Sequence, residues 1–111
     1  MTQAEMLIML YDGMLKEIYL VKKAFALNPP DIAEINRGLQ KVHRILLYLK
    51  SSLDCNYDIA NNLLSLYDYF DWVVTQANVK KDAKGLDEVI DMITGLKDSY
   101  VEADKSIRMH V

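Results

Sequence analysis

Apolar residues recur at alternating intervals of three and four positions along most of this chain, and this spacing constrains the fold more than any other feature. Between Ile32 and Leu53 the pattern runs without an error through positions 32, 35, 39, 42, 46, 49 and 53. The same spacing returns at 59, 63, 66, 70, 73 and 77, and again at 86, 89, 93, 96, 100, 103 and 107. Because an α-helix has a period of 3.6 residues, each run forms one apolar stripe along a helix. The pattern predicts an all-α protein.

Three short breaks separate the helical segments. Thr2-x-x-Glu5 fits a capping box at the start of the first helical segment. Asn28-Pro29-Pro30 ends that segment, because proline lacks an amide proton and disfavours helical backbone in the preceding residue. Asp31 is a second candidate cap, residues 54–58 form a polar break, and Asp82 is the expected cap of the last segment. The predicted helices cover about 3–27, 31–53, 57–79 and 82–107.

The connections between these helices are short, which favours antiparallel packing of neighbours. A chain of 111 residues is large enough for one modest core but not for two. We therefore expect a single domain, residues 1–111, folded as an antiparallel up-down-up-down four-helix bundle.

The composition argues against several classes of partner and compartment. The net charge is −3, with scattered lysines and arginines, so no basic patch for nucleic acid is expected. Cys55 is the one cysteine, which rules out an intramolecular disulfide and favours a cytoplasmic location. No basic leader and cleavage site mark a signal peptide, and no run approaches the ~20 apolar residues that cross a bilayer. We expect neither nucleic-acid binding nor membrane insertion.

Residues of an enzyme or a metal site do not occur at the required spacing. Di-iron bundles need Glu-x-x-His pairs, but Gln40 and Ile107 stand three positions before His43 and His110. One cysteine and two distant histidines do not fit a zinc site, and no glycine-rich phosphate loop occurs. We expect no catalytic residues, no metal and no cofactor. A histidine phosphotransfer domain is disfavoured because Arg44-Ile45-Leu46-Leu47, not Lys-Gly, follows His43, which we interpret as a surface histidine.

Several of the helices carry a second apolar row beside the main stripe, more than one core needs. This row could form the walls of a groove for an amphipathic helix, or it could widen the core or bury a homodimer face. The residues of this second row that we select as partner-binding candidates are Ile8, Tyr11, Leu15, Ile45, Tyr48, Tyr67, Val74, Ile90 and Val101.

A repeated tripeptide carries a family resemblance. Leu10-Tyr11-Asp12, within Thr2 to Gly13, recurs as Leu66-Tyr67-Asp68. Together with Ser52-Leu53-Asp54, Asn62-Leu63, Ala77-Asn78, Asp82, Leu86, Glu88-Val89, Leu96 and Asp98, these motifs resemble the flagellar export chaperone family FliS over nearly the whole chain. The arginines common in that family after Leu-Tyr-Asp-Tyr are replaced here by Trp72-Val73.

The resemblance implies a function in binding rather than in catalysis. Family members resemble one another as antiparallel helical bundles that hold the disordered C-terminal segment of flagellin in hydrophobic grooves. This prevents premature polymerisation and keeps flagellin competent for type III flagellar secretion. The resemblance therefore implies flagellin as the partner, with other flagellar export components as further candidates. From the apolar stripes we expect a monomer or weak homodimer. A structural, dimerising bundle is the alternative.

Overall fold

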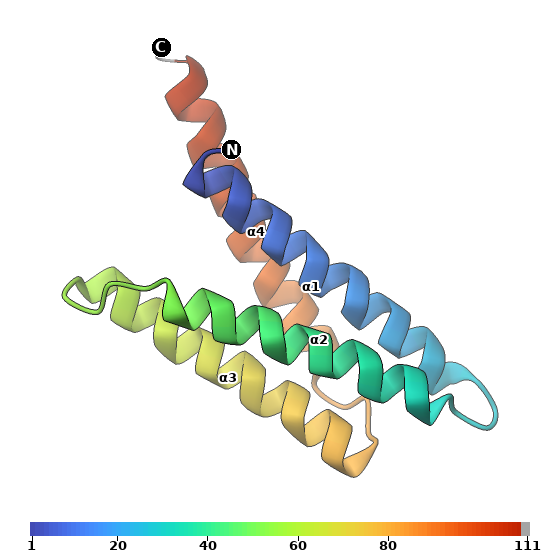
Figure 1. Cartoon of the computed structure of the whole chain (residues 1–111). Helices are drawn as coiled ribbons and strands as arrows, with labels where there is room; N and C mark the ends of the chain where they lie inside the picture. Colours follow the sequence, from blue (N-terminus) through green and yellow to red (C-terminus); the bar gives the residue numbers. More distant parts are fainter. Residues whose placement is uncertain (110–111) are drawn as a thin grey trace.

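Four helices make up the fold, which we describe from a computed structural model covering residues 1–109, with side chains described for residues 1–106. They are α1 (Gln3–Ala26), α2 (Ile32–Ser51), α3 (Asp58–Lys80) and α4 (Leu86–Met109). Successive helices run in opposite directions (Figure 1), and the described residues contain no strand. The predicted all-α, up-down-up-down four-helix bundle is confirmed.

The ends of α1 and α2 follow the predicted capping signals. The Thr2 side chain accepts a hydrogen bond from the Glu5 amide at 3.0 Å. The Asp31 carboxylate accepts one from the Glu34 amide at 3.2 Å, and α1 ends just before Asn28-Pro29-Pro30. Each cap satisfies an amide that has no partner inside its own helix.

The prediction that Asp82 caps α4 is wrong. Its carboxylate instead accepts a hydrogen bond from the Lys84 amide at 2.9 Å, inside the connection, and α4 begins only at Leu86. Two residues of this connection have left-handed backbone, Lys81 with φ 50° and Gly85 with φ 91°. They redirect the chain between α3 and α4, and glycine adopts such a conformation without steric cost.

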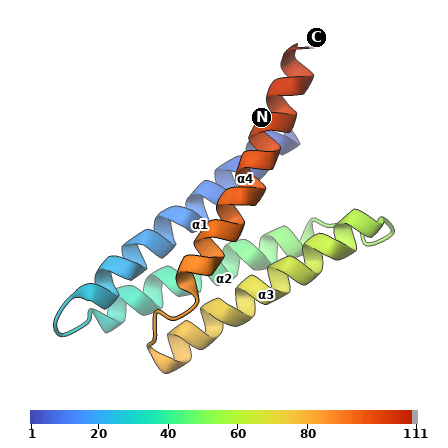
Figure 2. The ribbon, with the colours of Figure 1, turned by 180° about the vertical axis from the view of Figure 1, so that it is seen from behind.

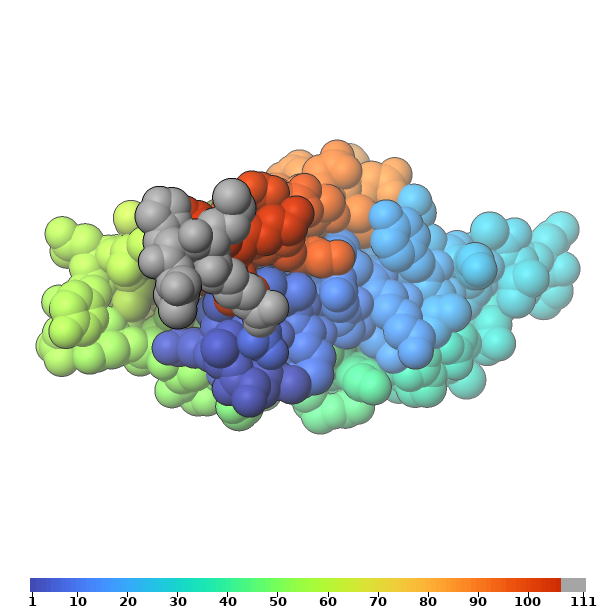
Figure 3. Space-filling model, turned by 90° about the horizontal axis from the view of Figure 1, so that it is seen from above, coloured from blue at the N-terminus to red at the C-terminus, as the bar shows by residue number. Residues whose placement is uncertain are grey.

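The helices do not close into a regular bundle. α1 packs against both α2 and α4, α2 also packs against α3, and α3 and α4 are the least closely packed neighbours. In Figures 1 and 2 the start of α1 and the second half of α4 point away from the α2–α3 hairpin. Figure 3 shows the second half of α4 (red) beside the start of α1 (dark blue), with the α2–α3 connection (yellow-green) to one side. The bundle therefore opens at the end where α3 begins.

The contact between α1 and α2 is the most extensive between any two helices of the described part. Val21 of α1 is buried, and a Cβ atom built on Gly38 of α2 would overlap the Cγ2 atom of Val21. The absence of a side chain at Gly38 therefore allows the two helices to approach closely.

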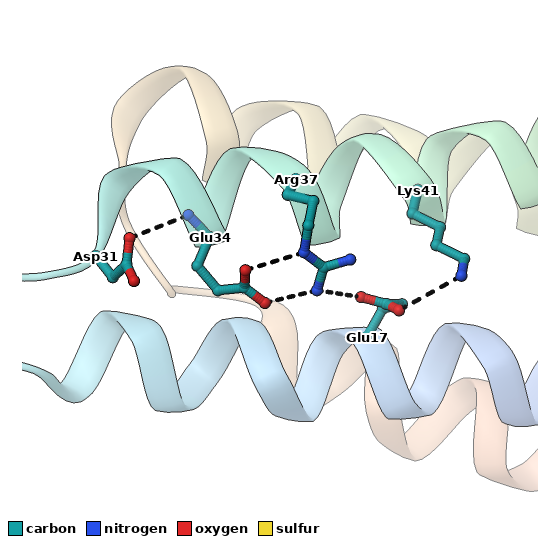
Figure 4. A network of polar contacts seen from close by, with 5 residues as sticks. All are labelled: Glu17, Asp31, Glu34, Arg37 and Lys41. Carbon is teal, nitrogen blue, oxygen red and sulfur yellow. Dashed lines mark hydrogen bonds and ion pairs between the residues drawn. The ribbon is translucent and has the colours of Figure 1, made fainter.

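A buried carboxylate links the same two helices. Glu17 of α1 is 5% exposed and faces two cations of α2 (Figure 4). Its carboxylate accepts a hydrogen bond from Arg37 Nη2 at 2.8 Å and lies 3.7 Å from Lys41 Nζ. Arg37 is held in turn by Glu34, with Nη2 to Oε1 at 2.6 Å. The charge of Glu17 is thus compensated by paired cations, as burial of a carboxylate requires.

Within the described residues, no helix has the length and apolar character that a membrane span requires.

Candidate functional site

A hollow of about 240 Å³, which we call the cleft, lies at the open end of the bundle. It is bordered by α1, α3, α4 and the α2–α3 connection. Its lining residues are Gln3, Leu7, Ser52, Leu53, Asp54, Tyr57, Ile59, Ala60, Leu63, Tyr67 and Tyr100. Most of these side chains are apolar or aromatic, so the cleft is suited to an apolar side chain of a partner rather than to polar catalysis.

The cleft is open because α4 does not cover the main-stripe residues at the start of α3. Ile59 is 70% exposed, and Leu63 and Tyr100 are only partly buried. Further along the same stripes Phe70 and Ile93 are fully buried. The second half of α4 lies beside α1, so the first half of α3 lacks the neighbour that would complete its burial. The main stripes, which sequence analysis assigned to the core, therefore supply walls of the cleft.

The floor of the cleft joins the two copies of the repeated tripeptide. The hydroxyl groups of Tyr11 and Tyr67 share a hydrogen bond of 2.5 Å, and the ring centroid of Tyr100 lies 5.8 Å from that of Tyr11. Burial, followed by the hydrogen bond to Tyr67, raises the pKa of Tyr11 far above its ordinary value, and burial also raises the pKa of Tyr67. Both hydroxyls are therefore neutral at physiological pH and act as a structural pair.

Five of the nine second-row candidates are buried between the helices, and contact of these five side chains with a partner stays a prediction. Their side chains are at most 9% exposed: Tyr11, Leu15, Tyr67, Val74 and Ile90. The reason is that the helices bury a wider apolar face than one stripe wherever they cross closely. Of the five, only Tyr67 also borders the cleft.

The other four second-row candidates reach the surface. Tyr48 is 50% exposed, and Ile8, Ile45 and Val101 are partly buried. Ile45 lies against Gly13 of α1, where a Cβ atom would be 3.7 Å from its Cδ1 atom. The hydroxyl of Tyr48 lies 3.7 Å from the Met6 sulfur. Contact of these four side chains with a partner stays a prediction.

His43 is paired rather than free. Its Nδ1 atom lies 2.6 Å from Asp71 Oδ1, and Lys50 Nζ approaches Asp71 Oδ2 at 3.2 Å and Asp68 Oδ1 at 3.0 Å. The His43 side chain is 42% exposed, which agrees with its interpretation as a surface histidine. Among the described residues, no group of three or more His, Cys, Asp or Glu side chains is arranged to hold a metal ion.

Comparison with known proteins identifies relatives of one family. Residues 1–107 match the family model described as flagellar protein FliS. The flagellar secretion chaperone FliS of Bacillus subtilis is 34% identical over 107 residues, which are 96% of this chain and 79% of the relative. The FliS chaperone of Vibrio cholerae is 35% identical over 83 residues, which are 73% of this chain and 61% of the relative. That of Salmonella typhimurium is 32% identical over 95 residues, with shares of 83% and 69%.

Proposed function

This chain belongs to the family of the flagellar protein FliS, and from that premise we propose that it is a cytoplasmic secretion chaperone whose client is flagellin. FliS is a family of chaperones, not of enzymes. The chain binds the disordered C-terminal segment of flagellin, prevents its premature polymerisation and keeps it competent for type III flagellar secretion. The protein acts as a monomer or weak homodimer.

The observation that carries this proposal is the apolar cleft formed by unburied stripe residues. The exposed side chain of Ile59 and the partly buried Leu63 border the cleft on α3, and Tyr100 borders it on α4. An amphipathic segment that folds in the cleft packs against these side chains and buries the apolar surface that α4 does not cover. Ile8, Ile45, Tyr48 and Val101 are further contacts where the client continues over the bundle.

Binding of a disordered client has a thermodynamic signature. Ordering the segment is unfavourable, so affinity depends on a long apolar contact, whose burial gives a negative heat-capacity change. Calorimetric titration of a synthetic peptide from the flagellin C-terminus into this protein measures both Kd and that heat-capacity change.

Two matched substitutions test where the client binds. Ile59 and Ile32 are both exposed isoleucines in the first turn of a helix, but only Ile59 borders the cleft. An acidic residue is favourable in a first turn, so Ile59→Asp and Ile32→Asp both leave the helices intact. Burying an isoleucine contributes about 1.5–3 kcal/mol, of which Ile59 stands to gain a large part on binding, so Ile59→Asp weakens binding by roughly ten- to thirtyfold. Ile32→Asp leaves Kd unchanged.

The possible outcomes separate the parts of the proposal. Equal affinities of the two variants mean that the client does not use the cleft. A wild-type protein that does not bind the flagellin peptide refutes the flagellin assignment. If analytical ultracentrifugation shows a stable dimer, and Ile59→Asp dissociates it, the structural, dimerising alternative is favoured.

A further inference from the structure

The cleft lies between two parts of the molecule that diverge from each other (Figure 2). One part, which we call the arm, consists of residues 3–12 of α1 and 96–109 of α4. The other part is the hairpin of α2 and α3 with its connection. The arm contributes Gln3, Leu7 and Tyr100 to the lining of the cleft, and all its other lining residues belong to the hairpin. The width of the cleft therefore depends on the angle between the arm and the hairpin.

The four glycines of the chain fall into two classes. Gly38 allows two helices to pack closely, and Gly85 has the positive φ of 91° that its turn requires. Neither reason applies to Gly13 and Gly95. A Cβ atom on Gly95 would have no neighbour within 4 Å, and one on Gly13 would make an ordinary van der Waals contact at 3.7 Å. Alanine fits at both positions and favours a helix more, so packing explains neither glycine.

The two unexplained glycines lie at one level of the bundle, where the arm begins. Lys97 Nζ lies 2.6 Å from Asp12 Oδ1. This ion pair places the neighbour of Gly13 beside the residue two positions after Gly95. In the hairpin, α3 contains no glycine, and the one glycine of α2 is the tightly packed Gly38. Each of the two helices that leave the hairpin therefore carries a glycine at the point of divergence.

Side-chain hydrogen bonds loosen α4 around its glycine. The Thr94 hydroxyl donates to the Ile90 carbonyl at 2.7 Å, and the Ser99 hydroxyl donates to the Gly95 carbonyl at 3.0 Å. Bonds of this kind, made to the preceding turn, compete with the backbone hydrogen bonds of a helix and often bend it. Because glycine has no side chain to restrict its backbone, these features together lower the cost of bending α4 at this turn.

We propose that Gly13 and Gly95 are hinges about which the arm turns, so that the cleft works as a clamp. In the free protein, closure of the arm covers apolar surface of Ile59 and Leu63, which water disfavours. A bound apolar segment takes the place of the arm against these side chains and holds the cleft open. The movement does not depend on the identity of that segment, whereas its role in client binding rests on the proposed function.

The arm is long enough to convert a small rotation into a measurable displacement. Lys105 lies ten residues after Gly95, which corresponds to about 15 Å along the helix. A bend of about 20°, the size of a small helix kink, displaces this residue by about 5 Å. The floor of the cleft moves little, because Tyr11 lies two residues from Gly13 and is hydrogen-bonded to Tyr67.

Distances between spin labels on cysteines measure this movement in the free protein. The pair across the cleft joins the exposed native Cys55 of the hairpin connection to Lys105→Cys on the arm. Two control pairs each stay within one part: Cys55 with Ser65→Cys in the hairpin, and Met9→Cys with Lys105→Cys in the arm, the latter combined with Cys55→Ser. The distance distribution across the cleft is expected to be about 5 Å broader than those of the control pairs.

Two double variants identify the hinges. Gly13→Ala with Gly95→Ala is expected to narrow the distribution across the cleft to the width of the control pairs, since alanine restricts the backbone to the helix. The matched control is Asn62→Ala with Thr75→Ala, which raises helix propensity at two exposed positions of α3, outside the hinges. This control is expected to leave the distribution unchanged.

Equally narrow distributions for all three label pairs would overturn the inference, and so would a broad distribution that alanine at both hinges does not narrow. Addition of the flagellin C-terminal peptide is expected to shift the distribution across the cleft to its longer distances. Calorimetric binding of the peptide without that shift would overturn the inference and leave the proposed function intact. Absence of peptide binding would refute the flagellin assignment, and the labels on the free protein would still decide whether the hinges exist.

Discussion

Gly38→Ala is expected to destabilise the protein even though alanine is the better helix former. In an exposed helix interior this change stabilises by about 1 kcal/mol. At Gly38, however, the new Cβ atom overlaps Val21 Cγ2, and Val21 is fully buried. A β-branched side chain in a packed core has little freedom to move, so the overlap costs about 2–3 kcal/mol. The net loss in the free energy of unfolding is about 1–2 kcal/mol.

Other glycines and a double variant provide the controls. Gly95 of α4 has no atom within 4 Å of a built Cβ, so Gly95→Ala is expected to stabilise by about 0.5–1 kcal/mol. In a Val21→Ala background the overlap disappears, and Gly38→Ala is then expected to stabilise as well. The coupling energy between positions 21 and 38 is thus about 2–3 kcal/mol.

Urea unfolding followed by far-UV circular dichroism measures these differences. Trp72 is too exposed to serve as the unfolding probe. If Gly38→Ala stabilises the protein as much as Gly95→Ala does, α1 and α2 do not approach as closely as described, and the reasoning from the overlap is wrong.

Two further predictions follow from the buried second row. Tyr67→Phe leaves the Tyr11 hydroxyl without its partner and is expected to cost about 1–3 kcal/mol at neutral pH. Burial raises the pKa of both tyrosines in the folded state. Their contribution to the free energy of unfolding is therefore intact below about pH 10, where unfolded tyrosine is still neutral, and is lost as pH rises further. Urea midpoints between neutral and alkaline pH should fall less steeply for Tyr67→Phe than for the wild type, and identical slopes would contradict this. Val74→Asp buries an unpaired charge and is expected to cost more than about 3 kcal/mol, whereas Tyr48→Asp at the half-exposed position costs less than about 1 kcal/mol. Equal urea midpoints of the last two variants would mean that Val74 is not in the core.

Much of the fold could be predicted from local patterns. The stripe from Ile32 to Leu53 predicted α2, and Asp31 and Thr2 were correctly predicted to cap α2 and α1. These features depend on residues a few positions apart, so one sequence suffices to recognise them. The prediction that Asp82 caps α4 was wrong because a carboxylate can accept a hydrogen bond within a turn as readily as at the start of a helix.

The sequence indicated the general character of the site, an apolar surface, but not which residues form it. The excess apolar surface fitted a partner groove, a wider core or a homodimer face, and the family resemblance favoured the groove. The sequence could not distinguish Val74, which is buried, from Ile59, which is 70% exposed on the main stripe of the same helix. Two β-branched apolar side chains of the same helix therefore differ widely in exposure, and local sequence does not reveal which of them is covered.

The sequence by itself determined that four amphipathic helices form, where α1 and α2 begin and which faces are apolar, because periodicity and capping are local. Only the tertiary structure decided which apolar faces stay open. The left-handed residues Lys81 and Gly85 redirect the chain into α4, which packs against α1 more than against α3. Burial depends on how helix axes cross and on which neighbour fills each hole, and those distances join residues such as Tyr11 and Tyr67 that are far apart in the chain.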